Sequence, residues 1–189
     1  TPGGGSVAAL SLAHAHSLSL MVARLTLAKE KWEEGHDAAK ASIELSEPAL
    51  DEAILLAISD SEAFQSVMSA YRLPKETEDE KKQRSEEIRN ATIGAALTPL
   101  NTASSAQKLL SNLEKQSAAC NPNALTDLAS ASEMAFSAAK IASLNVRINL
   151  EDIEGEDVDL LTSKINTAVE RCKKSANIVE LMVNKRLDW

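Results

Sequence analysis

Three consecutive glycines, Gly3 to Gly5, lie between Pro2 and Ser6 and precede a run rich in alanine and leucine. A glycine-rich turn that leads into a helix leaves backbone N–H groups without acceptors at the positive end of the helix dipole. Such N–H groups can bind an anion. The same residues also fit a flexible chain end followed by a serine N-cap. Taken alone, this segment leaves both interpretations open.

Two aspartates have positions that fit either a functional or a structural role. Asp60 shares a predicted helical face with the apolar residues Ala53, Ala57 and Val67, and a carboxylate inside a helix interface is costly unless it is paired or functional. Asp127 falls in the first turn of a predicted helix, where a carboxylate also complements the helix dipole. A structural ion pair and a dipole contact are the alternatives.

Polar residues of other types accompany these carboxylates. Asn145 and Asn149 are four residues apart and therefore line one side of a helix, where they can bind a neighbouring helix or a ligand. Arg72 and Lys75 flank Pro74 just beyond a predicted helix end. They are the cations best placed to offset a negative ligand, although cations in loops are often simply solvated.

The histidines and cysteines do not form a site. His14 and His16 are two residues apart, so they point in different directions on a helix and cannot form an i,i+4 metal pair. His36 stands alone, and we interpret all three histidines as structural or surface groups. Cys120 and Cys172 are too few and too isolated for a disulfide framework or a zinc site. We therefore expect no metal, and a reducing, cytoplasmic compartment.

Composition limits the class of protein. The 189 residues are 44% hydrophobic and only 3% aromatic, with a formal net charge of −8. We expect one domain, residues 1–189, whose core is built from aliphatic side chains. The negative charge argues against nucleic acid or an anionic membrane surface as the main partner. No signal peptide is visible, and the longest apolar run, residues 7–27, is interrupted by His14, His16 and Arg24, so we predict no membrane span.

Helical periodicity extends over almost the whole chain, and no strand pattern persists. We predict five long helices that form an all-α antiparallel bundle. Pro48 is expected to kink the second helix or to break it into two segments, and Pro99 is expected to kink the third helix. The clearest apolar stripe lies on the fifth helix, at Leu161, Ile165, Ala168, Cys172, Ala176, Val179 and Val183. The predicted helices span residues 6–34, 37–71, 77–115, 123–149 and 158–187.

Together these residues resemble the cyclodeaminase/cyclohydrolase family of folate enzymes, which includes the C-terminal domain of formiminotransferase-cyclodeaminase. The resemblance covers nearly the whole chain, in the family's order. This sequence has Cys120-Asn121 and Thr126-Asp127 where the family often has Gly-Asn and Ser-Asp. Residues of the family's first helix upstream of Thr1 are expected to be missing. The segments that carry the resemblance are PGGGSVAA (2–9), Asp60, Ala63-Phe64, YRLPK (71–75), Glu80-Lys81, Pro99-Leu100, Asn121, Asp127-Leu128, NVRINL (145–150) and Ile153.

The resemblance implies an all-helical homodimer that acts on a tetrahydrofolate substrate without a metal or an organic cofactor. Family members release ammonia from formiminotetrahydrofolate to give methenyltetrahydrofolate, and some relatives interconvert methenyl- and formyltetrahydrofolate with water. On this basis Asp60 and Asp127 are the candidate acid and base. The candidate substrate-binding residues are Gly3, Gly4, Gly5, Ser6, Arg72, Lys75, Asn121, Asn145 and Asn149. A non-catalytic folate-binding protein and a purely structural helical protein are the alternatives.

Overall fold

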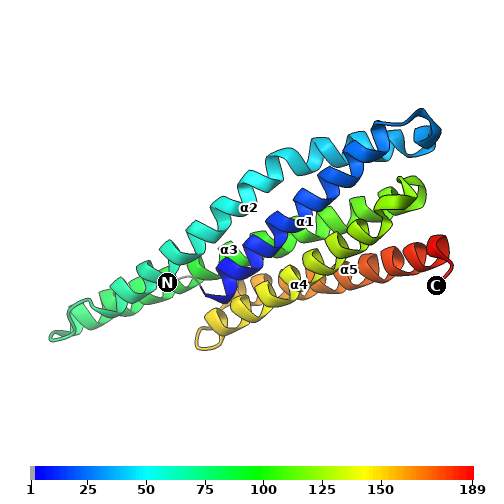
Figure 1. Cartoon of the computed structure of the whole chain (residues 1–189). Helices are drawn as coiled ribbons and strands as arrows, with labels where there is room; N and C mark the ends of the chain where they lie inside the picture. Colours follow the sequence, from blue (N-terminus) through cyan, green and yellow to red (C-terminus); the bar gives the residue numbers. More distant parts are fainter. Residues whose placement is uncertain (1–2) are drawn as a thin grey trace.

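Five long helices follow the five periodic segments of the sequence (Figure 1). The computed structural model describes residues 3–189, so Thr1 and Pro2, the first residue of the PGGGS motif, lie outside the described part. Two short 3₁₀ segments, η1 (Glu30–Gly35) and η2 (Pro122–Ala124), connect the long helices. The long helices are α1 (Gly4–Leu27), α2 (His36–Tyr71), α3 (Glu78–Ala119), α4 (Leu125–Leu150) and α5 (Glu156–Leu187).

Helices α1 to α4 form an antiparallel ring in which each helix contacts the next and α4 contacts α1. Helix α5 packs against α3 and α4 on one side of this ring (Figure 1). The core consists mainly of fully buried alanine and leucine side chains. Small side chains let helix axes approach closely, which suits a core with so few aromatic residues. The predicted stripe of α5 is confirmed, because all seven of its residues are buried.

By length and composition, helix α1 is long and apolar enough to span a membrane, although we predicted no membrane span from the sequence. Within the described residues, however, 61% of its most apolar stretch is buried in the bundle. Its neighbours on two sides are α2 and α4. These contacts are typical of a helix in the core of a bundle.

Neither internal proline ends its helix. Helix α2 continues through Pro48, so the break considered at this position is absent, and α3 continues through Pro99. A proline cannot donate to the carbonyl four residues earlier, so Pro99 leaves the carbonyl of Ala95 without its helical partner. The side chain of Asn149 donates a hydrogen bond to this oxygen from 3.0 Å. A side chain of α4 thus replaces the missing bond of α3.

The first helix ends earlier than predicted, at Leu27, and a 3₁₀ segment follows it. Trp32 in this segment has a non-helical backbone, with φ −110° and ψ 24°. Gly35 then lies so close to the carbonyl group of Ala119 that a β-carbon would collide with it. The close packing of this corner against the end of α3 therefore favours a glycine, and the chain turns here instead of continuing the helix.

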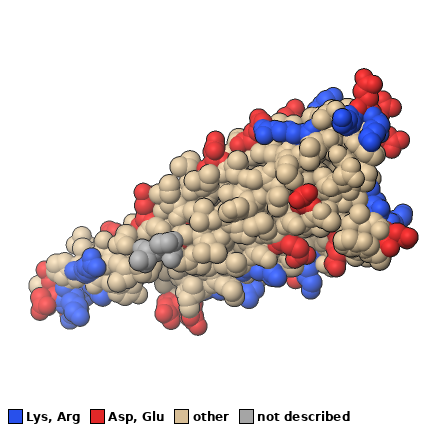
Figure 2. All heavy atoms as spheres, in the orientation of Figure 1, with Lys and Arg blue, Asp and Glu red and all other residues tan. Residues whose placement is uncertain are grey.

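The far ends of α2 and α3 form a hairpin that projects beyond the N-terminal end of α1 (Figure 1). Its turn is closed by a capping box, in which Thr77 accepts from the Glu80 backbone and the Glu80 carboxylate accepts from the Thr77 backbone. The pKa of Glu80 is lowered mainly because its carboxylate accepts hydrogen bonds from the backbone N–H groups of Thr77 and Glu76. Arg84 donates to the Tyr71 carbonyl across the hairpin. Figure 2 shows side chains of both charge signs gathered at this tip, and an uncharged surface in the middle of the same face.

Candidate active site at the N-terminal end of α1

A cavity of about 440 Å³ lies where the first turn of α1 meets α2, α3 and α4. Its polar side chains come from Asp60 on α2 and from Asn145 and Asn149 on α4. Apolar side chains cover the rest of the wall, so a flat ring system with a polar edge would match its lining. The lining residues are Gly3, Gly4, Asp60, Phe64, Val67, Ala95, Asn145, Ile148 and Asn149.

The glycines let two polar side chains approach the backbone of α1. Gly3 is the extended N-cap residue, and Gly4 and Gly5 are already helical. A β-carbon on Gly5 would occupy the space of the Asp60 carboxylate, and one on Gly4 would lie 2.8 Å from Nδ2 of Asn145. The backbone N–H groups in this first turn precede the regular i→i−4 pattern of the helix. The glycine segment is therefore part of a packed site and not a loose end.

Asp60 is held through only one of its two carboxylate oxygens. Ser6 Oγ donates to Asp60 Oδ2 from 2.9 Å, and Ser6 Oγ also lies 3.1 Å from the Ala57 carbonyl and 3.3 Å from Ser61 Oγ. Among the described residues, no hydrogen bond and no ion pair involves Oδ1 of Asp60. The structural ion pair considered from the sequence is therefore absent there, and Oδ1 is available to a ligand.

The two asparagines use their amide nitrogens within the protein. Asn145 Nδ2 donates to the Ile141 carbonyl of its own helix from 2.9 Å, and Asn149 Nδ2 donates to Ala95. Neither Oδ1 atom has a hydrogen bond among the described residues. Together with Asp60, these oxygens make the side chains of the cavity rich in acceptors. A ligand with N–H groups and positive charge would complement them.

Six residues predicted for the site do not line this cavity in the same chain. Gly5 and Ser6 are buried beside Asp60, and the other four lie farther away. Arg72 and Lys75 are exposed in the hairpin turn, and Arg72 is about 18 Å from Asp60 along α2 at 1.5 Å per residue. Asn121 contacts the opposite end of α1, where its backbone N–H donates to Thr26 Oγ1 from 3.0 Å. Asp127 lies in the first turn of α4, about 27 Å from Asn145 along that helix.

The structure also adds residues that sequence reasoning did not name. Ser61 approaches Ser6, and Ile148 contributes an apolar wall. Ile148 lies between the two asparagines in the NVRINL segment, and its exposed position at helical spacing was the available signal. Nothing in the local sequence pointed to Ser61, because its place in the site depends on its contact with Ser6, 55 positions earlier in the chain.

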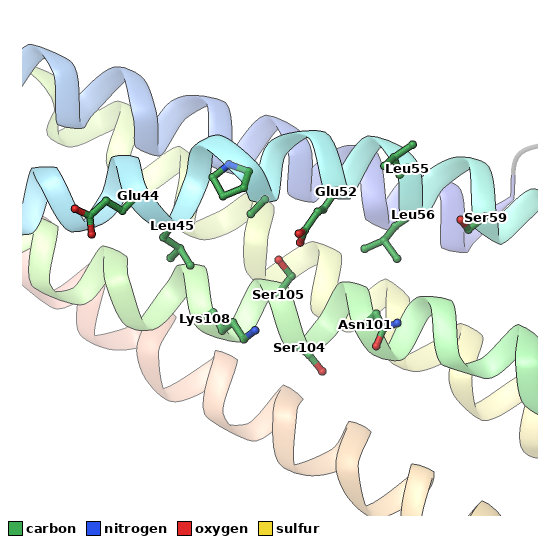
Figure 3. A pocket seen from close by; sticks show the side chains of 12 residues that line it. Glu44, Leu45, Glu52, Leu55, Leu56, Ser59, Asn101, Ser104, Ser105 and Lys108 are labelled. Carbon is green, nitrogen blue, oxygen red and sulfur yellow. The ribbon is translucent and has the colours of Figure 1, made fainter.

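A second, larger groove of about 560 Å³ lies between α2 and α3 and contains none of the predicted site residues. Figure 3 shows Ser105 and Lys108 on α3 facing Glu52 across this groove. Behind it, the buried His16 contacts Ser46 Oγ through Nδ1 at 3.0 Å and Ser105 Oγ through Nε2 at 3.4 Å. Burial lowers the pKa of His16 to about 4. His16 is thus a neutral core residue, in line with the structural role expected for it.

Comparison with known proteins identifies the family. The formiminotransferase-cyclodeaminase family model matches residues 1–171. The formimidoyltransferase-cyclodeaminase of Gallus gallus is 31% identical over 98% of this chain, and the methenyltetrahydrofolate cyclohydrolase of Methylorubrum extorquens is 34% identical over 82% of it. The chain spans 34% of the length of the first protein and 74% of the second.

A solved structure shares the whole fold. The crystal structure of formiminotetrahydrofolate cyclodeaminase from Thermotoga maritima superposes with a TM-score of 0.88 at 28% identity. The match covers 100% of this chain and 90% of the Thermotoga chain. The five-helix, single-domain arrangement predicted from the sequence is confirmed by this likeness. The chain therefore belongs to the formiminotransferase-cyclodeaminase family, a family of cyclodeaminase and cyclohydrolase enzymes that act on folate derivatives.

Proposed function

We propose that this chain converts formiminotetrahydrofolate to methenyltetrahydrofolate and releases ammonia, with Asp60 as the proton-transfer group. The observation that carries the proposal is the position of Asp60 in the cavity. Its carboxylate borders the glycine turn of α1 and has one oxygen without a protein partner among the described residues. Full-length similarity to the cyclodeaminase of Thermotoga maritima supports the choice of reaction.

The reaction needs a group that accepts and then returns one proton. The arylamine nitrogen of the substrate attacks the carbon of the protonated formimino group, and its N–H proton passes to Asp60. Asp60 then protonates the amino group on the tetrahedral carbon. The bond between this carbon and the amino nitrogen breaks, ammonia leaves, and a delocalised methenyl cation remains. A carboxylate beside the reacting carbon would serve as base and acid, and its charge would stabilise the cation.

The other cavity residues would hold the folate. The Oδ1 atoms of Asn145 and Asn149 would accept hydrogen bonds from N–H groups of the pterin, while Phe64, Val67 and Ile148 would cover its faces. The first-turn N–H groups near Gly3, Gly4 and Gly5 would bind a carbonyl oxygen or an anionic group of the substrate. Polar hydrogen bonding at the edge and apolar contact on the faces together suit a flat heterocycle.

Arg72, Lys75, Asn121 and Asp127 can reach such a cavity only if a second copy of the chain supplies them. We propose that the protein forms a homodimer, which the family resemblance also implies. The uncharged middle of the face in Figure 2 supports this proposal. Helix α1 crosses that face (Figure 1) and leaves Val7 54% and Leu10 43% exposed.

We also propose a cytoplasmic location. Buried free thiols at Cys120 and Cys172 fit this location.

Mixing two inactive variants tests whether subunits share a site. If Asp127 acts on the cavity of its partner, a mixture of Asp60→Asn and Asp127→Asn subunits regains activity in heterodimers. If Asp127 has no catalytic role, the Asp127→Asn variant is fully active by itself. Size-exclusion chromatography with light scattering measures the oligomeric state directly, and a monomer at assay concentrations would contradict the dimer.

Methenyltetrahydrofolate cyclohydrolase is the second candidate, because the Methylorubrum extorquens relative bears that name at 34% identity. In this reaction water attacks the methenyl carbon and Asp60 takes a proton from the water. Asp60 then returns this proton to the leaving nitrogen, the C–N bond breaks, and the hydroxyl on the carbon loses its proton to solvent to give the formyl product. Two assays separate the candidates. The first starts from formiminotetrahydrofolate and follows methenyl absorbance together with ammonia, and the second starts from methenyltetrahydrofolate and follows the loss of absorbance. A cyclodeaminase is fast in the first assay, a cyclohydrolase only in the second, and activity in neither would refute both.

A further inference from the structure

We infer that Ser6 is a positioning residue that orients the Asp60 carboxylate so that Oδ1 carries the transferred proton. This inference rests on the function proposed above and assigns to Ser6 a role other than substrate binding. Ser6 is only 2% exposed, so it has almost no surface to offer a ligand. Its hydroxyl instead lies 2.9 Å from Asp60 Oδ2.

The hydrogen of Ser6 has two acceptors within reach. The Ala57 carbonyl is 3.1 Å away, but it can already accept the helical N–H of residue 61. An ionised carboxylate is the stronger acceptor, because hydrogen bonds to charged groups are about twice as strong as neutral ones. Ser6 therefore donates to Asp60 when the carboxylate is ionised. The Ser61 hydroxyl, 3.3 Å from Ser6 Oγ, can donate in turn to the oxygen of Ser6.

Contacts on two sides fix the plane of the carboxylate. Oδ2 is held by Ser6, and Oδ1 lies against Gly5, where it occupies the space that a β-carbon would take. The terminal torsion of an aspartate has a broad energy minimum, so these contacts set the orientation that the side chain alone would not keep. Among the described residues Oδ1 has no hydrogen-bond partner, and it is therefore the oxygen that exchanges the proton with substrate.

Removal of the hydroxyl should slow the chemical step and leave binding unchanged. In Ser6→Ala we expect kcat to fall by about 10- to 100-fold, since small errors in the placement of a catalytic group have effects of this size. We expect KM, and the Kd of folate from calorimetry, to change by less than about twofold, because uniform binding is not affected. Ser11→Ala is the matched control, because Ser11 lies on the same helix and its hydroxyl bonds only the Met134 carbonyl among residues 3–189. It should retain the wild-type kcat.

A double-mutant cycle with Asp60→Asn shows whether Ser6 acts through Asp60. If it does, Ser6→Ala lowers kcat in the wild-type background but causes little further loss in the Asp60→Asn background. An equal loss in both backgrounds, a rise in KM at unchanged kcat, or a fully active Ser6→Ala variant would each overturn the inference. Ser6→Cys, which fills the same space with a weaker donor, repeats the test if circular dichroism finds the alanine variant unfolded.

The same measurements separate this inference from the proposed function. A wild-type protein without activity on either folate, or a fully active Asp60→Asn variant, would refute the assignment of Asp60 itself. An inactive Asp60→Asn variant combined with a fully active Ser6→Ala variant would leave Asp60 in place and refute only the role of Ser6.

Discussion

The side-chain amide of Asn149 donates a hydrogen bond to the backbone carbonyl of Ala95, 54 residues away in the chain, at 3.0 Å. This carbonyl has no helical donor because the residue four positions later is Pro99. Asn149 therefore supplies the hydrogen bond that Pro99 cannot donate to Ala95 of α3, at the wall of the cavity. Its Oδ1 atom remains available to a ligand. The same side chain therefore has a structural role, and under the proposed function it also binds the folate.

This hydrogen bond predicts that substitutions of Asn149 and Pro99 have coupled effects on the free energy of unfolding. Asn149→Ala removes the donor, and we expect it to lower the free energy of unfolding by about 1–3 kcal/mol because a polar group is left unsatisfied. In a Pro99→Ala background residue 99 regains its N–H, so the same Asn149→Ala substitution should cost clearly less. Urea unfolding of the four proteins measures this difference, and an identical cost in both backgrounds would show that Asn149 does not compensate for Pro99.

A substitution at Gly5 tests whether activity requires the close approach of α1 to the Asp60 carboxylate. A methyl group at position 5 would occupy the space of the carboxylate, so Gly5→Ala should displace Asp60 and lower kcat by about 100-fold or more. Gly94→Ala is the matched control, because a β-carbon there meets no atom within 4 Å. It should leave activity unchanged and stabilise α3 by up to about 1 kcal/mol through helix propensity. A Gly5→Ala variant with normal turnover would show that Asp60 tolerates the shift, or that it is not the reacting group.

The buried His16 predicts how stability depends on pH. Its pKa is about 4 in the folded protein, because burial disfavours the charged ring, against about 6.5 for a histidine in an unfolded chain. Above pH 6.5 the ring is neutral in both states and has no effect on stability. As the pH falls from 6.5 to 4, only the unfolded chain gains the proton, so the folded state loses up to about 3 kcal/mol. In His16→Gln the loss over this range should be smaller. Denaturant unfolding at pH 7 and pH 4.5 measures it, and identical losses in the two proteins would contradict the prediction.

Much of the fold follows from local sequence, because burial on one helical face repeats every three to four residues. The stripe from Leu161 to Val183 on α5 is an example, and its residues are buried as predicted. The end of α1 at Leu27 was not predictable in this way. It depends on the packing of Gly35 against Ala119, a contact between distant parts of the chain.

In the candidate site, too, some residues could be predicted from local sequence, and others depend on contacts between distant parts of the chain. Asp60 was recognisable as a carboxylate on an apolar face, and Asn145 and Asn149 as amides on one side of a helix. Whether the glycines formed a site or a loose end was open, because the answer lies in contacts with residues more than 50 positions away. Asn121 and Asp127 became candidates through the family resemblance. The 18 residues from Asp127 to Asn145 on one helix correspond to about 27 Å, and the structure places Asn121 and Asp127 at the opposite end of the bundle from the cavity.

The most direct test of the account compares the wild-type protein with Asp60→Asn on formiminotetrahydrofolate, with methenyl absorbance and ammonia measured in the same reaction. The account predicts equal amounts of both products from the wild-type protein. It predicts a kcat lower by about 100-fold or more for Asp60→Asn, the usual contribution of a general acid–base group. Folate binding and the unfolding midpoint of the variant should remain close to those of the wild type. An Asp60→Asn variant that is folded and fully active would contradict the central role of Asp60.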